Sequence, residues 1–267
     1  MGLPDPARQK MARDKLADWL ARADTVYAVH YACESFSAGA QIGTPRVTAI
    51  AVHNLATGQT SEFSIRQMAE LHHLVPAEIT PNLATLERML LDGFAQFVRL
   101  TKHARFLHWN MNSPTYGFAA LSHRLQVLGG EAFEVHDSAA LDLARAVEDI
   151  YGSGYAGQRS KLQGLAQLNG LIRTGHLSGP DEATAFAEGR YRDIAVSCAA
   201  KASLIAEVMR RAASGRLRTT AGVVARHGGP VRLMIRKMYE NPAYTIATGI
   251  AGGCIVMLKA YDYLFGG

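Results

Sequence analysis

The chain has 267 residues, of which 48% are hydrophobic and 19% are charged, and this balance excludes a globally disordered protein. Three cysteines give no disulfide framework, and no pair of Cys or His residues has the short spacing of a zinc site. The formal net charge of +5 is unevenly distributed, because residues 1–207 contain 19 basic and 21 acidic side chains.

The N-terminal residues 1–23 predict an amphipathic helix, because Lys, Arg and Asp interrupt the apolar positions between Pro4 and Asp24. The same charges argue against a signal peptide, so we expect the domain at residues 24–207 to stay in the cytoplasm. Its β-branched and aromatic runs predict five strands, at Thr25–Cys33, Pro45–Leu55, Thr60–Ile65, Arg105–Trp109 and Ala132–His136.

Helices are predicted between and after these strands, at Arg66–His73, Asn82–Thr101, Tyr116–Val127, Ala139–Ile150, Lys161–Asn169, Asp181–Ala187 and Arg190–Ser214. The clearest pattern is an apolar stripe in the second of them, formed by Leu83, Leu86, Leu90, Phe94 and Phe97. Ser138 is expected to cap the helix that starts at Ala139, which would put Asp142 one turn inside that helix.

A basic arm follows at residues 208–241, in which positions 208–239 contain eight basic side chains and no acid. These are Arg210, Arg211, Arg216, Arg218, Arg226, Arg232, Arg236 and Lys237. Such a segment binds anionic surfaces, so we expect a membrane surface or a nucleic acid as its partner. The alternative is a solvated helix face.

The last segment, residues 242–267, is apolar, and Pro242–Leu258 contains no charged residue. A membrane-spanning helix needs about 20 residues, which this segment reaches if Lys259 extends its ammonium to the interface. Gly249 and Gly253 form a GxxxG pair that would allow self-association. If the helix spans, the basic arm places the main domain at the inner face of the membrane; the alternative is a buried or interfacial helix.

Three segments resemble the motifs of the DEDD-type 3′–5′ exonucleases, a branch of the ribonuclease H-like superfamily. They are Val29–Phe36 (VHYACESF) with the strand Arg46–Val52, Leu107–Arg124 (LHWNMNSPTYGFAALSHR) and Tyr191–Ala202 (YRDIAVSCAAKA). The resemblance covers roughly residues 24–210 and includes the order of strands and helices. It implies an α/β fold with a mixed five-stranded sheet flanked by helices, to which this chain adds a C-terminal helical arm.

The resemblance also implies four carboxylates that hold two Mg²⁺ or Mn²⁺ ions. With the alternative registers, the corresponding positions carry Ala32, Glu34, Gly117 or Tyr116, and Lys201 or Cys198. Only Glu34 is an acid, so it is the one metal ligand and catalytic residue carried over. A lysine at position 201 would repel a cation and is expected to pair with Glu34 instead.

Other residues offer a rearranged site. Asp137, after the predicted fifth strand, is the second candidate catalytic acid, and Asp142 follows it; helix capping and a solvated face are their alternative roles. His30 and His108 lie near the ends of two strands and would form a mixed metal site with Glu34. Strand histidines also occur as hydrogen-bonded core residues.

Trp109 and Asn110 are expected to shape a turn at the cleft near Tyr116. Three functional hypotheses follow. The first is a membrane-associated, nuclease-like protein that has lost two-metal catalysis and binds nucleic acid or an unidentified protein partner. The second is an active 3′–5′ exonuclease with a rearranged metal site. The third is a protein-interaction scaffold.

Overall fold

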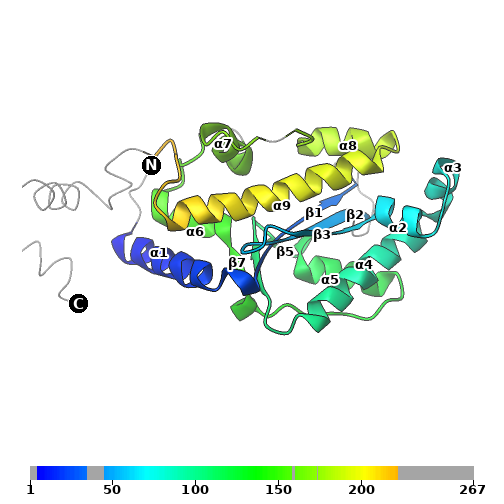
Figure 1. Cartoon of the computed structure of the whole chain (residues 1–267), viewed down its shortest axis with the longest axis horizontal. Helices are drawn as coiled ribbons and strands as arrows, with labels where there is room; N and C mark the ends of the chain where they lie inside the picture. Colours follow the sequence, from blue (N-terminus) through cyan, green and yellow to red (C-terminus); the bar gives the residue numbers. More distant parts are fainter. Residues whose placement is uncertain (1–4, 35–44, 158–159, 173, 222–267) are drawn as a thin grey trace, which may run out of the picture.

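A five-stranded mixed sheet forms the centre of the computed structural model, which describes residues 5–34, 45–157, 160–172 and 174–221 (Figure 1). Its strands are β1 (Val26–Cys33), β2 (Val47–Asn54), β3 (Thr60–Ser64), β4 (Arg105–His108) and β7 (Ala140–Asp142). They lie in the order β3-β2-β1-β4-β7, with antiparallel pairing from β3 to β1 and parallel pairing from β1 to β7. The expected α/β class and mixed five-stranded sheet are confirmed.

Helices cover both faces of the sheet (Figure 1). One face packs against α9 (Tyr191–Ala213), beside which lie α1 (Pro6–Ala21), α6 (Leu143–Tyr151), α7 (Lys161–Leu168) and α8 (Gly179–Ala187). The other face packs against α2 (Ile65–Leu71), α4 (Leu83–Leu100) and α5 (Phe118–Val127). Two short elements complete this side, the helix α3 (Pro76–Ile79) and the hairpin of β5 (Asn112–Ser113) and β6 (Tyr116–Gly117).

The alternation of side chains along β1 decides which residues face α9. Val26 and Ala28 belong to the core beneath α9, whereas Val29 and Tyr31 belong to the core beneath α4 and α5. Because strand side chains alternate with a period of two, His30 continues the face of Val26 and Ala28. The α9 face of β1 therefore carries a histidine near the carboxyl end of the strand.

The predicted fifth strand at Ala132–His136 is wrong, because the edge strand is β7 at Ala140–Asp142. Residues 132–136 instead lie over α4 and α5: the Phe133 N–H donates to Ser122 Oγ at 3.1 Å, and its ring packs edge-on against Phe94. The helix that follows starts later than expected. Its N-cap is Asp142, which accepts the Ala144 N–H at 3.0 Å, so Ser138 is not the cap.

Most other predicted helices and strands are present, with ends that coincide or are shifted by no more than three residues. Tyr116 is an exception, because it lies in β6 rather than in the helix that follows. The expected boundary between residues 207 and 208 falls inside α9, which continues to Ala213. Within the described residues no helix is long and apolar enough to cross a membrane. The predicted apolar segment 242–267 lies outside them.

Candidate functional site

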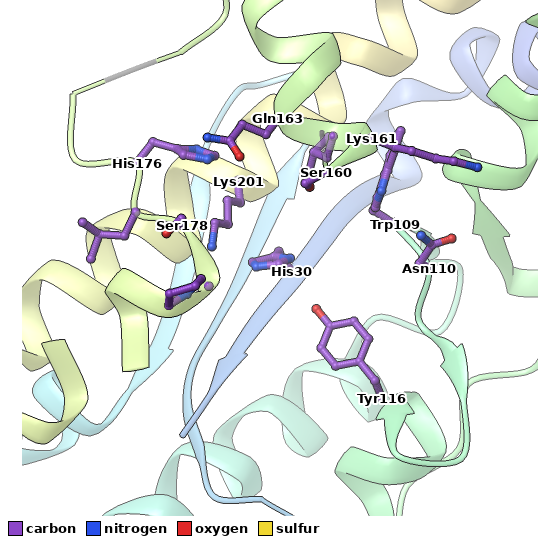
Figure 2. A pocket seen from close by; sticks show the side chains of 14 residues that line it. His30, Trp109, Asn110, Tyr116, Ser160, Lys161, Gln163, His176, Ser178 and Lys201 are labelled. Carbon is purple, nitrogen blue, oxygen red and sulfur yellow. The ribbon is translucent and has the colours of Figure 1, made fainter. Parts of the chain in front are cut away.

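A cleft lies between the carboxyl-terminal half of β1 and the helices α8 and α9, and Figure 2 shows one part of it. It consists of two adjoining hollows of about 540 and 770 Å³, a size typical of ligand sites. Five residues line both hollows: His30, Tyr116, Gly179, Pro180 and Lys201. The first hollow continues to the turn after β4 and the start of α7, and the second to the end of β1.

A buried ion pair lies in the wall of this cleft. Lys201 Nζ on α9 is 2.7 Å from Glu182 Oε1 on α8, and the two residues are only 8% and 7% exposed. The Ser197 hydroxyl donates to the same carboxylate oxygen at 2.7 Å and accepts the Leu177 N–H at 3.0 Å. These contacts join α8, α9 and the segment before α8, so the pair holds one wall of the cleft together.

Two histidines lie beside this pair. Burial lowers the pKa of His30 well below its ordinary value, and the nearby Lys201 ammonium and His176 lower it further. The pKa of His176 is lowered by burial and by Lys201, while the Glu182 carboxylate opposes this shift. Because both pKa values lie below the ordinary value near 6.5, both rings are neutral at pH 7.

A second lysine in the cleft is also paired. Lys161 Nζ, at the start of α7, is 2.6 Å from Glu148 Oε2 and lies 5.2 Å from the centre of the Tyr155 ring. With both lysines matched by carboxylates and both histidines neutral, the cleft carries little net charge at pH 7. Its remaining polar lining includes hydroxyl and amide groups, from Ser160, Gln163 and Asn110.

The turn after β4 contains Trp109 and Asn110 and borders the cleft, as the sequence predicts. Asn110 has a positive φ of 54°, and its N–H donates to Asp142 Oδ1 at 3.1 Å. The Asn112 side chain donates to the other oxygen of the same carboxylate. Trp109 is only 8% exposed and packs edge-on against Tyr155. Asp142 therefore caps α6 and holds this turn, and Trp109 contributes mainly to the core.

The expected mixed metal site of His30, His108 and Glu34 does not assemble. Ala28 on β1 pairs with Leu107 on β4, so His30 lies on the α9 face and His108 on the opposite face. There His108 packs against Phe118, its Nδ1 accepts the Met111 N–H at 3.2 Å, and burial lowers its pKa while Asp142 raises it. His108 therefore has the alternative role of a buried, hydrogen-bonded histidine.

Glu34, the retained acid, follows the end of β1, just after the pairing register with β2 shifts between Ala32 and Cys33. Its carboxylate accepts the backbone N–H of Arg46 at 3.0 Å and the Arg46 guanidinium at 3.1 Å. The expected pair with Lys201 is therefore wrong, since each residue has a different partner. Glu34 does not line either hollow.

Asp137 does not join Glu34 either. It is exposed in a 3₁₀ turn at the amino end of β7, whereas Glu34 follows the carboxyl end of β1, which runs parallel to β4 and β7. Among the residues that the structure describes, no group of three or more His, Cys, Asp or Glu side chains is placed to hold a metal ion. The residues at the expected two-metal site therefore do not fit Mg²⁺ or Mn²⁺.

Three of the six positions indicated by the family resemblance converge on the cleft, while Glu34, Gly117 and Cys198 do not line it. Ala32, Tyr116 and Lys201, from three separate motifs, all line the second hollow. Gly117 follows Tyr116 and donates its N–H to the Tyr31 hydroxyl at 2.9 Å. A Cβ atom at Gly117 would lie 2.6 Å from the Met111 carbonyl oxygen, so the backbone leaves no room for a side chain there. Cys198, the alternative to Lys201, is fully buried, and its thiol contacts the His30 backbone oxygen on β1 at 3.2 Å.

Several cleft residues were not predicted from the sequence, namely Ser160, Lys161, Gln163, His176, Ser178 and Glu182, nor was Ser197, the buried residue that supports Glu182. One signal was present: Ser178 and Asp181 have capping-box spacing, and Ser178 caps α8. That spacing predicts where α8 starts along the sequence, but it does not predict that this helix borders the cleft. The pairing of Lys201 with Glu182 is a tertiary contact without a local pattern.

Two residues of the predicted basic arm have structural roles. Arg210 and Arg211 belong to α9, both pair with Glu207, and they donate to the backbone oxygens of Leu55 and Asn169. They are therefore held against the domain rather than extended toward an anionic surface. Arg216 bonds to Ser214, and the Arg218 backbone is held by Asn169. The expected surface residues Arg226, Arg232, Arg236 and Lys237 lie outside the described residues.

Comparisons with protein-family models, with curated proteins and with solved structures find no match to this chain.

Proposed function

We propose that this protein is a nuclease-like module that binds a nucleic-acid strand in the cleft without two-metal hydrolysis. The buried pair of Lys201 and Glu182 is the observation that carries this proposal. Two-metal hydrolysis needs several oxygen ligands around its cations, and here an ammonium group lies where the resemblance implies an acid. A cation near that ammonium would be repelled and would have to break the existing ion pair.

The likeness to a ribonuclease H-like exonuclease domain is part of the proposal. It is supported by the mixed sheet, whose order is compatible with that fold, and by three motif positions that line one cleft. Nucleic acid is favoured as the ligand because the lining combines amide, hydroxyl and aromatic groups. Such groups hydrogen-bond to base edges and sugars and stack on bases.

The alternative of an active exonuclease with a rearranged site has less support, because Glu34, Asp137 and His108 do not line the cleft and the described residues contain no group of three that could hold a metal ion. The protein-interaction scaffold is the function that the binding test below would favour if the chain bound neither DNA nor RNA. Attachment to the inner face of a membrane through residues 242–267 remains a proposal that rests on the sequence alone. Pelleting with anionic vesicles, with and without these residues, tests it; a full-length chain left in the supernatant would contradict it.

The binding test uses the full-length chain and fluorescent single-stranded DNA and RNA, first in EDTA and then in Mg²⁺ or Mn²⁺. We expect a rise in anisotropy in EDTA and intact oligonucleotides on a denaturing gel in either metal. Gln163→Ala, in the cleft, should weaken binding about two- to tenfold, the value of one hydrogen bond. The control is Gln167→Ala, an exposed glutamine one turn further along α7 that lines neither hollow.

Metal-dependent shortening of the oligonucleotide by the wild-type chain, absent in Glu34→Gln, would overturn the proposal in favour of the rearranged exonuclease. No binding to either nucleic acid would overturn it in favour of the scaffold.

A further inference from the structure

Four polar side chains from three segments gather in one part of the cleft. Figure 2 shows His30 on β1, His176 and Ser178 before α8, and Lys201 on α9 directed toward the same space. The nine-residue helix α8 begins here, and its first residues Gly179 and Pro180 also line the hollow. The Ser178 hydroxyl caps this helix by accepting the Asp181 N–H at 3.3 Å, and Asp181 and Glu182 already place negative charge in its first turn, so an anion here would be held by the side chains of the cleft rather than by the helix terminus.

The Lys201 ammonium retains donors for a ligand. An ammonium has three N–H groups, and the contact with Glu182 at 2.7 Å occupies one of them. The Ser197 hydroxyl helps to hold that carboxylate in place, so the pair need not break when a ligand arrives. Lys201 lines both hollows although it is buried, so its ammonium borders the open space.

We propose that this part of the cleft binds a phosphate-type dianion through Lys201, His30 and His176, with uptake of protons by the two histidines. The inference rests on the proposed function, in which the dianion is the terminal phosphate of a nucleic-acid strand. A free nucleotide or inorganic phosphate offers the same group, and the experiment separates these sources.

Proton uptake follows from the charges that face the histidines. Around His30 these groups are Lys201 and Cys198 from α9, Glu182 from α8, His176, and Tyr116 from β6. His176 faces Lys201 and Glu182. The lysine and the glutamate cancel, and Asp181 at the start of α8, whose pKa is lowered by hydrogen bonds from Ser178 and by the charge of Lys201, adds a further carboxylate. An empty cleft therefore has no net positive charge. A dianion stabilises the protonated rings, which raises their pKa and supplies the missing charge.

The first experiment titrates the full-length chain with inorganic sulfate by calorimetry at pH 5.5, 6.5 and 7.5. Sulfate keeps a fixed charge over this range, so any pH dependence comes from the protein. We expect affinity to fall as pH rises, by up to about tenfold per pH unit for each proton taken up. Buffers of different ionisation enthalpy should show that proton uptake directly.

Single variants identify the titrating groups. His176→Gln and His30→Gln should each weaken sulfate binding at pH 5.5 and reduce the number of protons taken up by about one. The matched control is His103→Gln, an exposed histidine near the amino end of β4, which should change neither quantity. Sulfate affinity that is independent of pH, or the same loss in all three variants, would overturn the inference.

The second experiment compares oligonucleotides that end in a 5′-phosphate, a 3′-phosphate or hydroxyl groups, together with a mononucleotide and inorganic phosphate. A preference for one phosphorylated end at pH 6, lost in His176→Gln, supports the inference. Oligonucleotide binding without any such preference overturns the inference and leaves the proposed function intact. Binding of the mononucleotide or inorganic phosphate without binding of any oligonucleotide supports the anion site and overturns the proposed function.

Discussion

Lys201→Met should destabilise the fold strongly, because it leaves the Glu182 carboxylate buried without its partner. The two side chains are only 10% and 9% exposed, and their charged atoms are 2.7 Å apart. Removal of one partner from a buried ion pair costs about 3–5 kcal/mol. The Ser197 hydroxyl still donates to Glu182, so the lower end, about 3 kcal/mol, is expected.

The double variant Lys201→Met/Glu182→Met removes both charges, so it tests whether the unpaired carboxylate causes the loss of stability in Lys201→Met. Replacement of a buried pair by apolar side chains is often neutral or stabilising, while the Ser197 hydroxyl loses its acceptor at a cost of about 1 kcal/mol. We therefore expect the double variant to be more stable than Lys201→Met. Lys161→Met is the matched control: its pair with Glu148 is 39% and 43% exposed, and such pairs contribute about 0–1 kcal/mol.

Urea denaturation followed by tryptophan fluorescence measures these free energies of unfolding at pH 7. The reasoning would be refuted if Lys201→Met cost no more than Lys161→Met. It would also be refuted if the double variant were as unstable as the single one, because then the carboxylate left behind would not be the cause.

Two further predictions concern the cleft. In buffer without phosphate or sulfate, the free energy of unfolding should fall as pH drops below about 6.5, because unfolded His30 gains a proton that the buried ring resists. His30→Asn should remove up to about 1.4 kcal/mol per pH unit from this slope, measured by urea denaturation at pH 7.0 and 5.5; an unchanged slope would show that His30 does not titrate on unfolding. Ala32→Asp/Lys201→Asp should not produce metal-dependent nuclease activity, because position 117 still lacks an acid and has no room for a side chain. The new carboxylate at position 201 would also lie beside the buried Glu182 and destabilise the fold. Degradation of single-stranded DNA by this double variant in Mn²⁺ would contradict that expectation.

The sequence predicted elements well where a long pattern exists. The apolar stripe of α4 and the alternation of β1 placed those elements within one or two residues. The sequence did not predict β7, because its three residues are too few to form a pattern. Ala132–His136 was predicted as a strand instead because of its composition. Phe133 shows why composition misled: its aromatic ring fills a gap beside Phe94 instead of packing on the sheet.

The site was predictable only in part. The motif resemblance brought Ala32 and Lys201 together, and both line the second hollow. The opposite faces of His30 and His108 depend on the pairing register of β1 with β4, which no local pattern reveals. Glu182 was missed for the same kind of reason, because the packing of α8 on α9 decides its partner.

The presence of Glu34 has a structural explanation that does not require catalysis. Arg46 links Glu34 to Glu87, a fully buried acid on α4 whose carboxylate also accepts the Val47 N–H at 2.8 Å and pairs with Arg124 at 2.6 Å. This chain of charges ties the end of β1 and the start of β2 to α4 and α5. Glu34→Ala would therefore disturb Arg46 and the buried acid behind it, so lost activity alone would not identify a catalytic residue. Glu34→Gln, which keeps a hydrogen-bond acceptor for Arg46, is the variant that separates the two roles.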